Sequence, residues 1–207
     1  MTIRHTGHRH SADGQMSTFT REIHAMQRNL AAGPRHHYSA RYYRPPTEAE
    51  IAAEAIDPAL REHRLEWQDK IDNLVVNEGL DLYLDSLTSA AVALSVGLTD
   101  GSPTFAGGDT MSSHAGWSEV TNYGEASRIS PTFAAASSQS RDNSANVATY
   151  SINATVTVGG AFVATNATKG GTSGTLLGGG PFAEGNKAMD SGGTLDVTIT
   201  LTQAAAA

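Results

Sequence analysis

The chain has 207 residues and a formal net charge of −7, from 14 Lys and Arg against 21 Asp and Glu. Its length suits one domain of ordinary size with an appendage, and its acidic balance disfavours general nucleic-acid binding. Because there are no cysteines, disulfide frameworks, thiolate zinc sites and cysteine nucleophiles are excluded. No apolar run approaches the roughly 20 residues of a membrane-spanning helix, and the N-terminus lacks the apolar core of a secretion signal, so we expect no membrane partner.

Charge is unevenly placed along the chain. Residues 1–47 hold seven Arg against two acidic residues, whereas residues 48–85 hold eleven acidic residues against three basic ones. Six of the eight histidines also lie within residues 1–37. These differences predict that the N-terminal segment is physically distinct from the rest of the chain.

Residues 1–60 are predicted to form an extended N-terminal arm with short helices. A first helix is expected near residues 17–32, because four apolar residues share one helical face: Phe19, Ile23, Met26 and Leu30. The following Pro- and Arg-rich stretch favours an extended backbone. Thr47 and Glu50 have the spacing of a capping box, which predicts a second helical stretch near residues 47–65.

Residues 61–207 are predicted to form a β-domain that contains one short helix near residues 77–88. Short segments of alternating or continuous apolar character predict strands, with the clearest at 91–98, 117–123, 147–158, 161–164, 175–177 and 194–201. Glycine-rich turns separate the later ones. This pattern indicates a mainly β fold, an antiparallel β-sandwich of Ig-like or jelly-roll-like type, although a small barrel shares the same signature.

Two groups of histidines are candidates for a chemical site. His5, His8 and His10 could ligate a metal, but a polar tail offers no rigid shell around them, so we predict no metal site. His114 lies in a Gly/Ser-rich loop, where a histidine more often forms a loop hydrogen bond than acts as a base. No catalytic or cofactor-binding residue is predicted, and we expect a protein that is not an enzyme.

The strongest docking signal is an alternation of arginines and tyrosines between residues 35 and 44. Six residues carry it: Arg35, Tyr38, Arg41, Tyr42, Tyr43 and Arg44. Arg and Tyr could stack on bases, but they are also favoured at protein–protein contacts. Because the rest of the chain is acidic, we predict that this part of the arm binds another protein. Removing residues 1–46 is then expected to leave the β-domain folded.

Several segments resemble a known family in order and spacing. The most specific are HAGWSEVTNY at 114–123, GGAFVATNATKGGTSGTL at 159–176 and SGGTLDVTITLT at 191–202. Over about residues 65–203 the chain resembles small structural proteins of tailed-bacteriophage virions, which are encoded next to the major capsid protein. The arm, residues 1–60, lies outside the resemblance.

The resemblance implies a virion location and a structural role without cofactor or catalysis. We expect a capsid decoration (cement) or head-fibre protein that binds the major capsid protein or another virion protein through its arm, as a homo-oligomer with a trimer favoured. The alternative is a tail, neck or tail-fibre component whose β-domain contacts the host surface through Trp117 and Tyr123. A β-sandwich enzyme acting on cell-surface polymer is a third possibility, disfavoured because no paired-carboxylate motif is evident.

Overall fold

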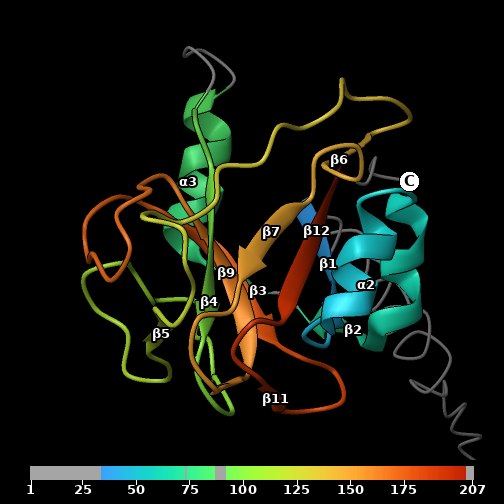
Figure 1. Cartoon of the computed structure of the whole chain (residues 1–207). Coiled ribbons are helices and arrows are strands. Elements are labelled where there is room, and N and C mark those ends of the chain that lie inside the picture. Colours follow the sequence, from blue (N-terminus) through green and yellow to red (C-terminus); the bar gives the residue numbers. More distant parts are fainter. Residues whose placement is uncertain (1–33, 73, 87–91, 204–207) are drawn as a thin grey trace, which may run out of the picture. The chain divides into compact units, whose positions relative to one another are not determined.

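A computed structural model describes residues 34–72, 74–86 and 92–203 (Figure 1). The helix expected at 17–32 lies outside these residues. Residues 34–203 form one compact unit. In chain order its elements are β1 (Pro34–Tyr43), α2 (Glu48–Glu54), the 3₁₀ helix η1 (Pro58–Arg64), β2 (Leu65–Asp72), β3 (Leu74–Val75), α3 (Asn77–Ser86), β4 (Ser95–Thr99), β5 (Glu119–Val120), β6 (Ser140–Asp142), β7 (Ala148–Ser151), β8 (Val156–Val158), β9 (Gly160–Ala164), β10 (Leu176–Pro181), β11 (Lys187–Met189) and β12 (Thr194–Gln203).

The strands form two five-stranded antiparallel sheets and a small ribbon. The first sheet has the order β2-β1-β12-β6, with β7 also paired to β12, and the second has the order β3-β10-β9-β4-β5. The ribbon pairs β8 with β11. The expected mainly β, antiparallel class is therefore confirmed.

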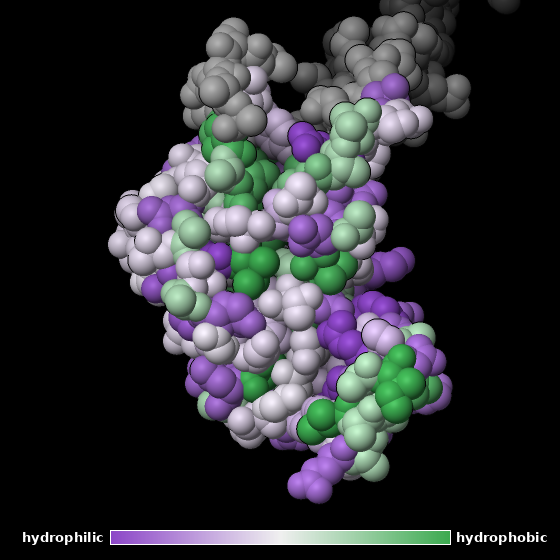
Figure 2. Space-filling view, turned by 45° about the horizontal axis from the view of Figure 1, so that its top comes forward, coloured by the Kyte–Doolittle hydropathy of each residue, from purple (hydrophilic) through white to green (hydrophobic). Residues whose placement is uncertain are grey.

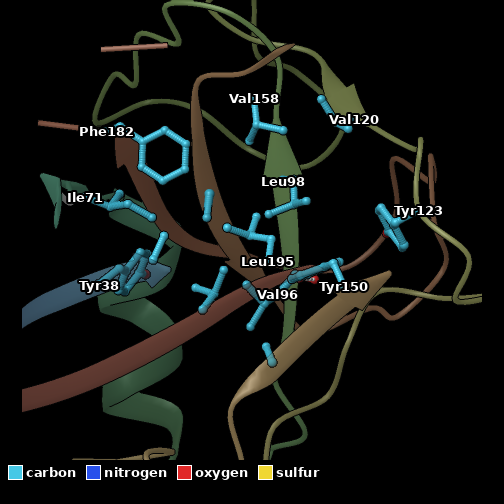
Figure 3. Close-up of a cluster of buried hydrophobic side chains, with 14 of the residues drawn as sticks. Tyr38, Ile71, Val96, Leu98, Val120, Tyr123, Tyr150, Val158, Phe182 and Leu195 are labelled. Atoms are coloured by element: carbon cyan, nitrogen blue, oxygen red, sulfur yellow. Dashed lines mark hydrogen bonds between the residues drawn. The ribbon is translucent and has the colours of Figure 1, made fainter. Parts of the chain in front are cut away.

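One hydrophobic core is shared by the two sheets (Figure 3). Tyr38 and Leu195 enter it from the first sheet, and Val96 and Leu98 enter it from the second. A smaller cluster that includes Trp117 and Phe162 packs against the second sheet. Because neighbouring residues of a strand face opposite sides, β9 sends Ala161 and Val163 into the main core and Phe162 into this second cluster.

The structure corrects the arm assignment for residues 34–60. β1 is an interior strand, paired along its whole length with β12 and on its other side with β2. His36, Tyr38, Ala40 and Tyr42 alternate with more polar residues, so every second side chain is buried. The domain boundary expected at residue 60 is therefore wrong, because the compact unit begins at Pro34.

Other elements follow the sequence more closely. The Thr47–Glu50 capping box is present at the start of α2, and Asp57 caps η1. Helix α3 occupies most of the expected range, 77–88. It lies so close to β10 that a Cβ on Gly79 would fall 2.1 Å from the Leu177 carbonyl oxygen.

Two expected strands are shorter or divided in the structure. Within the expected range 117–123 the structure has only the two-residue strand β5 and an isolated bridge between Tyr123 and Ile152, and the expected run 147–158 is split into β7 and β8. The short strands β6 and β11 were not predicted at all.

Candidate functional site

The three tyrosines expected to dock a partner are core or near-core residues. Tyr38, Tyr42 and Tyr43 are each at most 2% exposed. Tyr42 stacks on Trp67, and its hydroxyl accepts a hydrogen bond from the Asp190 N–H at 2.8 Å. These side chains therefore hold the sheet together and are not available to a partner, which corrects the predicted docking role.

The arginines of the same stretch are ion-paired within the chain. Arg41 donates two hydrogen bonds to the Glu62 carboxylate, and Arg44 does the same to Glu50. The Arg44 guanidinium, with further hydrogen bonds from Thr47, lowers the pKa of Glu50 to about 2. The Arg35 backbone pairs with Thr202 in the sheet, and its side chain lies outside the described residues.

These pairs help to hold residues 44–64, a segment that we call the 44–64 excursion. Arg41–Glu62 joins the excursion to β1, and Arg61 with Asp196 of β12, at 3.0 Å, joins it to the same sheet. Arg44–Glu50 and Arg64–Glu54, the latter at 2.6 Å between Nε and Oε1, form within the excursion. The Arg61 guanidinium also lies 4.0 Å from the centroid of the Tyr43 ring. The acidic run after residue 47 thus neutralises nearby arginines.

The outer side of the excursion exposes apolar side chains. Helix α2 has no buried residue, and its carboxylates Glu50 and Glu54 pair with Arg44 and Arg64 within the excursion. Ile51 is 57% exposed and Ile56 is 88% exposed. Glu48 and Asp57 are exposed near them along the chain. Apolar surface also emerges at separate places among polar side chains on the face drawn in Figure 2. Large apolar groups presented on a fixed, acidic element suit contact with another protein.

Trp117 and Tyr123, the residues expected to contact a host surface, are also buried. Trp117 is 6% exposed and stacks against His114, with the ring centroids 3.6 Å apart. Tyr123 packs edge-on against Tyr150 inside the main core (Figure 3). The prediction that they form a surface contact is therefore wrong, because their alternation with polar residues reflects core packing.

A metal site, a catalytic histidine and a membrane-spanning helix are the other features to examine in the part of the chain that the structure describes. Within residues 34–72, 74–86 and 92–203 no group of three His, Asp or Glu side chains is placed to hold a metal ion. His5, His8 and His10 lie outside this part. The His114 Nδ1 is 3.1 Å from the Trp117 carbonyl oxygen, a loop hydrogen bond of the kind expected. None of the described helices is both long and apolar enough to span a membrane.

Comparisons with known proteins give no family assignment. No family model matches the chain, and neither the curated proteins nor the solved structures contain a match.

Proposed function

We propose that this chain is a non-enzymatic structural protein of a tailed-bacteriophage virion, bound to the capsid as a decoration or head-fibre protein. The resemblance over residues 65–203 supports this role. Its most specific segments supply core residues such as Trp117, Phe162 and Leu195 of one β unit. We also propose that the two sheets with their shared core form a sandwich of Ig-like or jelly-roll-like type.

The observation that carries the proposal is the 44–64 excursion, which exposes Ile51 on helix α2, a helix with no buried residue, and Ile56 in the turn that follows it. In this role the excursion takes the place of the arginine–tyrosine stretch as the docking element. Its four ion pairs fix its conformation before binding, which reduces the entropy lost on association. The matching partner surface is an apolar groove with a basic rim, on the major capsid protein or another virion protein.

A homotrimer is the assembly we propose, because capsid lattices offer positions of local three-fold symmetry. The tail or fibre alternative depended on host contact by Trp117 and Tyr123. Both side chains are buried, so we retain the capsid-bound role.

Binding to particles that lack the protein tests this role. The full chain is added to particles purified from a phage strain in which its gene is deleted, and bound protein is measured after sedimentation. Full burial of an isoleucine contributes about 1.5–3 kcal/mol, so Ile56→Asp is expected to weaken binding about tenfold or more. Ala126→Asp, which places the same charge on an exposed loop, serves as the matched control.

The proposed docking element is contradicted if Ile56→Asp and Ala126→Asp bind as well as the unmodified chain. The proposed virion role is contradicted if the unmodified chain does not bind such particles at all.

A further inference from the structure

A mostly apolar cavity of about 460 Å³ opens beside the C-terminal half of α3. Its volume lies within the range of about 300–1,000 Å³ typical of small-molecule sites. Leu82 and Tyr83 line it from α3, and Leu201 lines it from β12. Val92, Leu94 and Leu177 extend its apolar wall.

Arg141 is the single charged residue among the described lining residues. It pairs with Leu201 across β6 and β12, so both side chains are on the same face of the first sheet. The Arg141 guanidinium lies 5.4 Å from the centroid of the Phe133 ring, which helps to orient it. The strand register therefore places a cation at an apolar cavity.

Arg141 also differs from the other arginines in its partners. Among arginines whose side chains the structure describes, Arg41, Arg44, Arg61, Arg64 and Arg128 each pair with a carboxylate of the chain. No such pair involves Arg141 within the described residues. In a chain with a net charge of −7, this leaves one guanidinium free to bind an anion.

Tyr83 connects this wall to a buried polar pair that carries no charge near neutral pH. Its hydroxyl is hydrogen-bonded to the His36 Nε2. Burial, together with the nearby His37, lowers the pKa of His36 to about 4, and burial raises the pKa of Tyr83 to about 12. Neither group therefore competes with Arg141 for an anion.

We propose that this cavity binds a small amphipathic carboxylate, such as a medium-chain fatty acid. The carboxylate accepts two hydrogen bonds from the Arg141 guanidinium, and the alkyl chain packs against Leu82, Val92 and Leu201. This inference does not depend on the proposed virion role.

Titration calorimetry of the full chain with decanoate, below its micelle concentration, tests the proposal. Because a hydrogen bond to a charged group is stronger than one between neutral groups, Arg141→Gln is expected to weaken decanoate binding about tenfold or more. Lys70→Gln removes the same charge from an exposed position outside the lining and is expected to change the affinity by less than about twofold. Val92→Trp, which fills the cavity from its partly exposed rim, is expected to abolish binding.

Decanol provides the second arm, because it has the same chain without the charge. It is expected to bind more weakly than decanoate and to be insensitive to Arg141→Gln. The proposal is overturned by the absence of saturable decanoate binding, or by equal effects of Arg141→Gln and Lys70→Gln. Binding of a peptide with a free apolar C-terminal residue, in place of decanoate, also overturns it and would indicate a peptide groove.

Discussion

Buried tyrosines of the core differ in whether their hydroxyl groups are hydrogen-bonded. The Tyr150 hydroxyl donates to the Val96 carbonyl oxygen at 2.7 Å and so joins the two sheets. The hydroxyl of its neighbour Tyr123 is buried and has no hydrogen-bond partner among the described residues. A buried polar group without a partner lowers stability, so the Tyr150 hydroxyl stabilises the fold whereas the Tyr123 hydroxyl, in the same core, destabilises it.

Replacing each of these tyrosines by phenylalanine is expected to give opposite results. Tyr150→Phe leaves the Val96 carbonyl without this donor and is expected to lower the free energy of unfolding by about 1–3 kcal/mol. Tyr123→Phe removes an unpaired hydroxyl and is expected to leave stability unchanged or raised. Urea unfolding of both variants measures the difference, and equal losses would contradict the assigned hydrogen bonding.

The titration of His36 makes the free energy of unfolding depend on pH under acidic conditions. Because its pKa is about 4 in the folded chain and 6.5 when unperturbed, the unfolded chain binds more protons between these values. This contribution to stability is complete above pH 6.5 and decreases as the pH falls towards 4. The shift corresponds to about 3 kcal/mol.

His36→Gln is therefore expected to flatten the pH dependence of unfolding between pH 6.5 and 4. Chemical denaturation at a series of pH values measures the slope. His63→Gln, at an exposed position, is the control and is expected to keep the original slope. If all three chains have the same slope, His36 is not buried in its neutral form.

Among the secondary-structure elements, β1 shows why the sequence patterns led to the wrong prediction of an exposed arm. Tyr38, Ala40 and Tyr42 have the period-two spacing of a strand, but the arginines and prolines around them favour an exposed arm. Glu62, the acidic partner of Arg41, lies 21 residues further along the chain, and only the tertiary fold brings the two side chains together. The pairing could not be predicted from local sequence.

Elements with a strong local signal were predicted well. Short stretches of local sequence are enough to predict the capping box of α2, the approximate range of α3 and the regular alternation of β12. Strands β6 and β11 have three residues each and form because a partner strand lies beside them. The cavity and the position of Arg141 depend on the pairing of β6 with β12, so they could not be predicted from the sequence either.

One buried ion pair anchors a loop to the edge of the second sheet. Arg128, whose side chain is 0% exposed, pairs with Glu119 of β5 at 2.7 Å. The same guanidinium donates to the carbonyl oxygens of Asn166 and Gly171. This interaction therefore fixes the loop between β9 and β10.

Glu119→Gln is expected to lower the free energy of unfolding by about 3–5 kcal/mol, because it leaves a buried guanidinium without its countercharge. Glu184→Gln makes the same change at an exposed carboxylate that pairs with Lys187 and is expected to cost at most about 1 kcal/mol. Thermal or urea unfolding compares the two. Similar small losses would show that the Arg128 pair is not desolvated.

At the scale of the whole molecule, the two ends of the described unit are joined. β1 begins it and β12 ends it, and they pair from Pro34 with Gln203 to Tyr43 with Thr194. Removing residues 1–33 is therefore expected to preserve a cooperative unfolding transition. Removing residues 1–46 deletes an interior strand and is expected to abolish that transition, measured by circular dichroism during heating. A cooperative transition in the shorter chain would instead support the original arm assignment.

The proposed structural role on a phage capsid is best tested by a cryo-EM reconstruction of particles from a phage whose genome carries this sequence. We expect density that fits the two-sheet unit of residues 34–203 at repeated positions on the outer capsid, with the 44–64 excursion against the shell. Particles that lack the chain, or that carry it only at the neck or tail, would contradict the claim.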